Sequence, residues 1–134
     1  MKEGWADKSF CLRKIKESPF NLIYCKCRNE YEICFESVKK CGILLKYCEC
    51  QDKEMCLAAV RNHPMALEFV KNQDYELCLE AVKGDGFALD YVKKEFMTEE
   101  LCIEALKNSD GYARLFFSEK EFPIAYQVWQ INYG

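Results

Sequence analysis

Cysteine is the residue type in this sequence with the most evident capacity for chemistry. Ten of the 134 residues are cysteines, and four of them form two close pairs, Cys25 with Cys27 and Cys48 with Cys50. Four thiolates can hold zinc in a tetrahedral site. However, positions i and i+2 of a helix point in nearly opposite directions, so neither pair chelates one ion easily. We therefore expect free, mostly buried thiols, and keep a structural zinc site at these four cysteines as the alternative.

Other residues that could support catalysis are sparse. The single histidine, His63, directly precedes Pro64, which predicts an exposed turn residue. A cysteine–histidine nucleophilic pair would need a neighbouring thiol, and Cys56 is expected to be buried and inert. The sequence contains neither a phosphate-binding glycine loop nor a metalloprotease or serine-hydrolase motif. We therefore expect a protein that is not an enzyme and needs no cofactor.

Five of the cysteines mark an internal repeat of 22 to 24 residues, which must position everything else. Each has an acid or a threonine four residues before it, apolar residues on both sides, an aliphatic residue four after it and a lysine or arginine five after it. These columns predict a short helix with an N-terminal cap and a wide buried face centred on the cysteine. The cysteines are Cys11, Cys34, Cys56, Cys78 and Cys102.

A glycine or proline follows each of these helices and predicts a break before a second short helix, with a left-handed cap at the glycines. The breaks are at Pro19, Gly42, Pro64, Gly86 and Gly111. Each unit is then a hairpin of two helices of roughly 8–9 residues that is stable only when stacked on its neighbours. We predict an all-α fold, a short solenoid of about five hairpins in one domain spanning residues 1–134. The expected repeats are 7–28, 29–50, 51–72, 73–96 and 97–120. The alternative is a compact helical bundle.

Stacking of the repeats also bears on the cysteines. Equivalent positions of stacked repeats lie about 10 Å apart, which disfavours a disulfide between Cys27 and Cys50.

The tail, residues 121–134, departs from the repeat and predicts a capping helix that Pro123 opens. Ile124, Val128 and Ile131 share one face of that helix, which we expect to pack on the last repeat. Trp129 could instead remain available as an apolar anchor for a partner.

Charge is divided unevenly along the chain. Residues 1–67 carry a net charge of +3 and residues 68–134 carry −6. Binding has to use positions that vary between repeats, so we predict that a partner protein contacts Glu80, Asp90 and Glu104 in the acidic half. Acidic rows of this kind could imitate nucleic acid and occupy the groove of a nucleic-acid enzyme.

A basic column repeats along the chain and could instead bind RNA, as some helical repeats do. Neighbouring acids offset this column, and the negative helix C-terminus accounts for it more simply. We therefore favour no direct contact with nucleic acid and keep a nucleic-acid-binding repeat as an alternative. The column consists of Lys16, Lys39, Arg61, Lys83 and Lys107.

The segment Gln73–Lys93 resembles a tandem helical-repeat family of unknown function whose consensus is NQT-x-E-x-C-L-x-A-V-K-x-x-G-x-A-L-x-Y-V-K. Residues 51–94 match this consensus best. Members of the family occur in bacteria, phages and giant viruses. The resemblance implies a repeat fold and a binding role. It also suggests a small phage or bacterial accessory protein that sequesters a host defence nuclease, as anti-CRISPR proteins do.

The sequence favours a cytoplasmic protein, in the host cytoplasm if a phage encodes it. Its N-terminus lacks the apolar region of a signal peptide, and no apolar run is long enough to span a membrane. We expect no contact with a membrane, and the sequence leaves the oligomeric state open.

Overall fold

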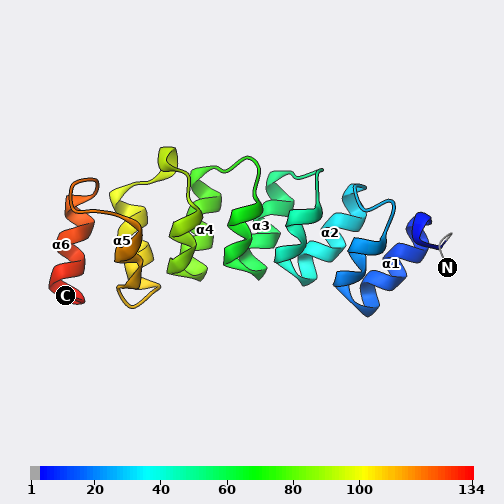
Figure 1. Ribbon diagram of the computed structural model, residues 1–134, viewed down its shortest axis with the longest axis horizontal. Helices are drawn as coiled ribbons and strands as arrows, with labels where there is room; N and C mark the ends of the chain where they lie inside the picture. Colours follow the sequence, from blue (N-terminus) through cyan, green and yellow to red (C-terminus); the bar gives the residue numbers. More distant parts are fainter. Residues whose placement is uncertain (1–3) are drawn as a thin grey trace.

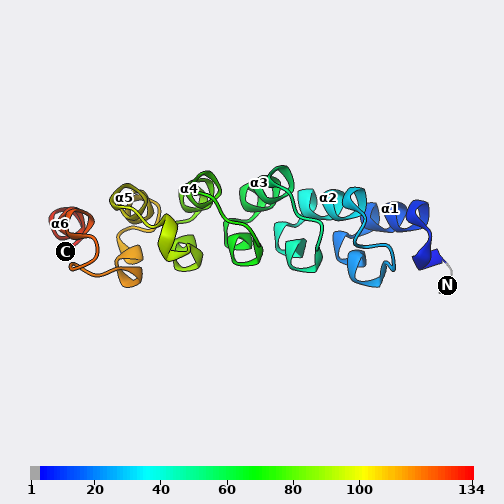
Figure 2. The same cartoon turned by 90° about the horizontal axis from the view of Figure 1, so that it is seen from above.

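The computed structural model describes residues 4–134 as a row of helical repeats with the two chain ends at opposite ends of the row (Figure 1). The predicted domain spans residues 1–134, and its first three residues lie outside the range that the structure describes. Seen from above, the α-helices form one layer and shorter 3-10 helices form the other (Figure 2). Successive repeats pack side by side along the row. The prediction of an all-α solenoid is therefore confirmed, and the alternative of a closed bundle is wrong.

Each repeat begins with an α-helix whose N-terminus is capped as its sequence predicts. The side chains of Asp7, Asp52, Asp74 and Thr98 accept hydrogen bonds from backbone N–H groups of the following turn. Glu30, the predicted weak cap, accepts none. The five helices are α1 (Lys8–Glu17), α2 (Tyr31–Lys40), α3 (Lys53–Asn62), α4 (Tyr75–Gly84) and α5 (Glu99–Lys107).

The second element of each repeat is a 3-10 helix rather than the predicted helix of eight or nine residues. Five or six residues make so short an element that the tighter i→i+3 hydrogen bonding satisfies more of its backbone than one α-turn could. These elements are η2 (Pro19–Tyr24), η3 (Gly42–Tyr47), η4 (Pro64–Phe69), η5 (Gly86–Tyr91) and η7 (Tyr112–Phe116). Two further 3-10 turns, η1 (Gly4–Ala6) and η6 (Lys94–Phe96), stand outside this pattern.

The core runs continuously along the row between the two layers. The repeat cysteine of each α-helix is buried there, as predicted, together with the aliphatic residue four positions later. A leucine of each of the first four repeats' 3-10 helices, such as Leu67 or Leu89, closes the core from the other layer, and Ala113 does so in η7. Neither layer could bury its apolar face without the other, which explains why these short elements fold only as a stack.

Close backbone contact between neighbouring repeats, rather than the predicted left-handed cap, explains why glycine occupies positions such as Gly86. Among the glycines of residues 4–134, only Gly111 has a positive φ, of 84°, and the preceding Asp110 has one of 50°. At Gly86, an added Cβ would lie 2.1 Å from the carbonyl oxygen of Ala105 in the next repeat. The N–H of Gly86 also donates to the carbonyl of Asn108. Where proline replaces the glycine, as at Pro64, it has no N–H to donate.

The tail forms α6 (Pro123–Asn132), which covers the end of the fifth repeat. The carboxylate of Glu99 on α5 accepts the N–H of Ala125 at 2.7 Å, and so fixes the start of α6. Of the predicted packing face, only Val128 packs against the core, and Ile124 and Ile131 are 57% and 82% exposed. Ala125 is fully buried instead, since its small side chain allows the close approach that the Glu99 contact imposes. No helix within residues 4–134 is long and apolar enough to cross a membrane.

Candidate interaction site at the fifth repeat

The connector that leaves each 3-10 helix must be fastened to the α-helix of its own repeat, and in repeats 3 and 4 a glutamine does this. Gln51 donates from Nε2 to the carbonyl of Phe69 at 2.9 Å and accepts the N–H of Lys71 at Oε1 at 3.0 Å. Its Oε1 also lies 3.5 Å from the Sγ of Cys56. Gln73 makes the same contacts in repeat 4, with Tyr91, Lys93 and Cys78. We call Gln51 and Gln73, with these bonds, the glutamine clamps.

Replacing Gln73 with methionine should destabilise the protein by about 2 kcal/mol, because the carbonyl of Tyr91 and the N–H of Lys93 lose their partners in a partly buried place. Urea unfolding of the variant and the wild type measures the difference. Lys83→Met is a suitable control, because Lys83 is exposed on the same repeat and should change stability little. Equal losses in the two variants would contradict the clamp.

Repeats 1 and 2 use thiols where repeats 3 and 4 use glutamine. The Sγ of Cys27 on the connector lies 3.7 Å from the Sγ of Cys11 on α1. Cys50 neighbours Cys34 of α2, and Cys25 and Cys48 also neighbour Cys11 and Cys34. Cys25 and Cys48 are buried, and their thiols donate to carbonyls of their own 3-10 helices, those of Asn21 and Leu44.

The alternative of one zinc site that groups Cys25, Cys27, Cys48 and Cys50 is therefore not formed among the described residues. Each cysteine of this set is held within its own repeat instead, because the connector folds back onto the α-helix that precedes it. Within the described residues, no group of three histidine, cysteine or acidic side chains is placed to hold a metal ion.

The fifth repeat has no glutamine clamp between its α-helix and its connector. Met97 stands where Gln51 and Gln73 stand in their repeats, and it cannot bridge α5 to the connector. The extra turn η6 also separates repeats 4 and 5. A cavity of about 390 Å³ results, with apolar walls. They are formed by Leu89, Val92, Met97, Phe116 and Phe122.

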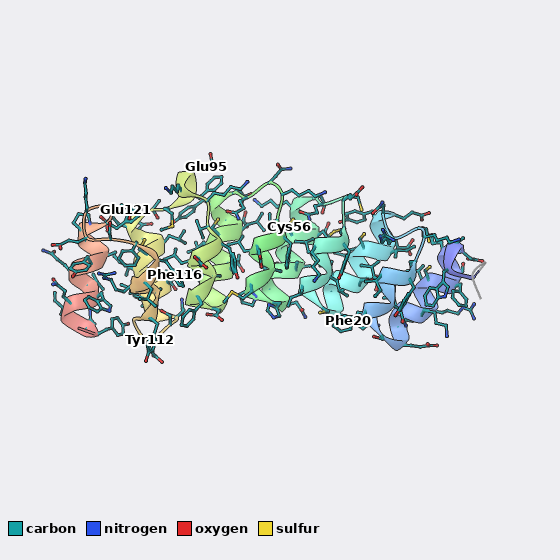
Figure 3. The ribbon with its side chains drawn as sticks, in the orientation of Figure 1. Phe20, Cys56, Glu95, Tyr112, Phe116 and Glu121 are labelled. Carbon is teal, nitrogen blue, oxygen red and sulfur yellow. The ribbon has the colours of Figure 1, made fainter. Side chains whose placement is uncertain are left out.

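Three charged side chains stand at the mouth of this cavity: Asp90, Glu121 and Lys94. Within residues 4–134, neither carboxylate forms an ion pair. Glu121 accepts only from the neighbouring Ser118. Figure 3 shows Glu121 and Glu95 along the connector edge, with Phe116 lying between that edge and Tyr112. The cavity thus combines apolar walls with an acidic rim.

The residues predicted to bind a partner do not form one surface. Glu80 and Glu104 lie on the α-helical layer, where Glu80 accepts from Nε of Arg61 at 3.3 Å and Glu104 from Nδ2 of Asn108 at 3.2 Å. Asp90 lies on η5 of the other layer and lines the cavity. Of the predicted acids, only Asp90 is placed at a hollow of the surface with apolar walls.

Trp129 is half-buried on α6 rather than a free anchor. Its ring centroid lies 5.6 Å from that of Tyr126, and the guanidinium carbon of Arg114 lies 5.4 Å from it. Arg114 also covers Tyr126, at 4.8 Å. A cation over two aromatic faces stabilises the cap, so we assign Trp129 first to holding α6 in place.

The basic column lies at the C-terminal ends of the α-helices, and acids partly neutralise it. Lys39 pairs with Glu36 at 2.8 Å, and Arg61 pairs with Glu80. Binding to nucleic acid by this column stays a prediction.

The single histidine, His63, is half-buried rather than exposed as predicted, because it ends α3 against the following η4. Its Nδ1 has no hydrogen-bond partner among the described residues.

Comparison with protein families gives one match. A family described as a domain of unknown function (DUF4116) matches three overlapping stretches in tandem, residues 31–73, 52–97 and 74–122. The chain belongs to this family. The three matches cover repeats 2 to 5, including the cavity. The resemblance seen in the sequence is therefore confirmed. Comparison with curated proteins found no match, and comparison with solved structures found none either.

Proposed function

We propose that this member of the family is a protein-interaction module, and that the cavity of the fifth repeat holds an apolar side chain of its partner. The observation that carries the proposal is the exchange of a clamping glutamine for Met97 beside an apolar cavity with unpaired carboxylates at its mouth. Binding hot spots are commonly apolar side chains seated in such hollows, with polar groups around them.

The occupant that fits best is a polypeptide segment with a large apolar residue next to arginine or lysine. A volume of about 390 Å³ exceeds a single side chain, so the cavity also has room for part of the adjoining chain. Asp90 and Glu121 attract positive charge, as does the net charge of −6 of residues 68–134. The same charges repel phosphate, which argues against nucleic acid as the ligand here.

Exposed apolar side chains near the cavity could extend the contact. Tyr112 is 63% exposed and Leu115 is 74% exposed, and both belong to η7, which also supplies Phe116 to the cavity wall. A peptide seated in the cavity could therefore continue along η7.

Selection from a displayed library of random linear peptides tests the proposal. The immobilised wild-type protein should enrich peptides with a tryptophan, phenylalanine or leucine adjoining arginine or lysine. Met97→Gln should lose most of this enrichment, because it makes the wall polar and offers the connector a clamp like that of repeats 3 and 4. Removing one apolar contact at the centre of an interface commonly costs about 2 kcal/mol, roughly 30-fold in affinity.

Met65→Gln serves as the matched control, because Met65 lies on η4 outside the cavity walls. It should enrich the same peptides as the wild type. Asp90→Asn combined with Glu121→Gln should keep the apolar preference and lose the basic one. Enrichment that is identical in the wild type and Met97→Gln would contradict the proposal.

The narrower role as an inhibitor of a host defence nuclease, in the manner of anti-CRISPR proteins, stays a prediction from the resemblance. The acidic rim of the cavity supports this role, because it suits a basic partner surface of the kind that nucleic-acid enzymes carry. Affinity capture of an added basic nuclease, compared between the wild type and Met97→Gln, tests this role directly.

A further inference from the structure

The paired thiols of repeats 1 and 2 stand apart from the cavity and carry a separate inference. We propose that Cys11 with Cys27, and Cys34 with Cys50, are dithiol pairs that a low-molecular-weight disulfide such as oxidised glutathione converts into two intramolecular disulfides. Each disulfide would fasten an α-helix to the connector of its own repeat.

The proposal rests on the contact measured between Cys11 and Cys27 and on the recurrence of both cysteines at the equivalent positions of the second repeat. The Sγ atoms of Cys11 and Cys27 are 3.7 Å apart, and Cys34 and Cys50 hold equivalent positions 23 residues later. Both pairs join the two parts of the repeat that the glutamine clamps join in repeats 3 and 4. Ala6 and Asn29 stand where those glutamines would be. The N-terminal repeats thus lack the clamp and have a second thiol instead.

The exposure of the four thiols determines which cysteine of each pair reacts first with glutathione disulfide. Cys27 and Cys50 are partly exposed on the connectors, whereas Cys11 and Cys34 are fully buried. The thiolate of Cys27 attacks one sulfur of the glutathione disulfide, and one glutathione leaves as its thiolate. Cys11 then gives up its proton and attacks the sulfur of Cys27, and the second glutathione leaves. Two protein thiols are oxidised, one glutathione disulfide is reduced to two thiols, and the two protons from the protein end on the two glutathiones.

The reaction should be slow at neutral pH. Burial raises the pKa of the Cys11 and Cys27 thiols to about 11, so little thiolate is present. The rate should rise nearly tenfold for each pH unit below that pKa. The oxidation state of such a pair should therefore change slowly with the ratio of oxidised to reduced glutathione, and the pair should not respond quickly to peroxide.

The test treats the reduced, full-length protein with oxidised glutathione at about pH 8. Mass spectrometry should find a loss of two hydrogens for each disulfide, and peptide mapping should find the links Cys11–Cys27 and Cys34–Cys50. Each link closes a loop of 17 residues within a repeat. The melting temperature should rise by roughly 10 °C, because both loops are constrained in the unfolded state.

Two variants make the result specific. Cys11→Ala should accumulate glutathione on Cys27, because the resolving thiol is gone, while the second link still forms. Cys41→Ala, which removes a partly exposed thiol outside both pairs, should behave like the wild type. Links between other cysteines, or glutathione that remains on Cys27 of the wild type, would overturn the proposal. Stoichiometric retention of glutathione with no rise in melting temperature would overturn it as well.

Discussion

Raising the pH from about 8 to about 10.5 should unfold the reduced protein. Burial raises the pKa of the Cys56 and Cys78 thiols to about 11, and that of Cys102 to about 12. In the unfolded chain, a cysteine ionises near its ordinary pKa of about 8.5. Below that pH both states hold the proton and the stability is complete. Above it the unfolded state releases protons that the folded state retains, so folding becomes less favourable until the folded pKa is reached.

The size of this effect follows from the number of buried thiols. Each contributes about 1.4 kcal/mol per pH unit, so these three alone remove about 4 kcal/mol per unit above pH 8.5. A protein of this size is stable by only about 5–15 kcal/mol, so these three thiols alone would unfold it between about pH 10 and pH 12. Burial also raises the pKa of the Cys11 and Cys27 thiols to about 11, which steepens the decline and moves unfolding toward the lower end of that range. Urea titrations at several pH values, under reducing conditions and followed by circular dichroism, measure the slope.

A comparison variant separates the thiols from the lysines and tyrosines, which also titrate at high pH. Replacing Cys56, Cys78 and Cys102 together with alanine should lower the stability at pH 7 but flatten its decline above about pH 8.5 by roughly 4 kcal/mol per unit. The same slope in both proteins would show that the buried thiols do not control alkaline stability.

Gly86→Ala should destabilise the protein by about 3 kcal/mol, because the new methyl group meets backbone rather than a movable side chain. Its Cβ would lie 2.1 Å from the carbonyl oxygen of Ala105, and relief requires that repeats 4 and 5 move apart. That movement would also stretch the hydrogen bond from the N–H of Gly86 to Asn108. Thermal and urea unfolding measure the loss.

Gly84→Ala is the matched control two residues away. Its Cβ would meet only Cγ of Pro64 closely, at 2.6 Å, and that half-buried ring can change its pucker, whereas the backbone carbonyl facing Gly86 cannot. Alanine also favours the helix by up to about 1 kcal/mol relative to glycine, so the net change should be small. A loss as large as that of Gly86→Ala would show that backbone contact between repeats is not the cause.

The repeat itself could be predicted from the sequence because each column has a local physical reason. Asp52, Asp74 and Thr98 cap their helices as the residue types predict, and the repeat cysteines are buried as their apolar neighbours predict. The 3-10 helices were missed because periodicity over six residues cannot separate them from one α-turn. The packing face of α6 was predicted only in part because Glu99, a distant residue, sets the orientation of that helix.

The candidate site was largely hidden from sequence reasoning. Asp90 was identified as an acidic position that varies between repeats, but its place at a cavity depends on the turn η6 and on the bend of the chain toward α6. One signal was present: Met97 breaks a column that Gln51 and Gln73 occupy. The meaning of that break required the contacts of the glutamines. The pairing of Cys11 with Cys27 was missed because a core column and a connector column were considered separately.

Methyl NMR of methionine tests the central claim, that the cavity beside Met97 receives a basic-flanked apolar side chain, most directly. The chain has four methionines, and of the three within residues 4–134 only Met97 lines the cavity. Addition of the blocked tripeptide Arg-Trp-Arg should shift the Met97 methyl resonance progressively, while buried Met55 in α3 and Met65 in η4 stay unchanged. The tripeptide Glu-Trp-Glu should cause much smaller shifts at the same concentration, since Asp90 and Glu121 repel it. An unmoved Met97 resonance, or equal shifts with both tripeptides, would contradict the account.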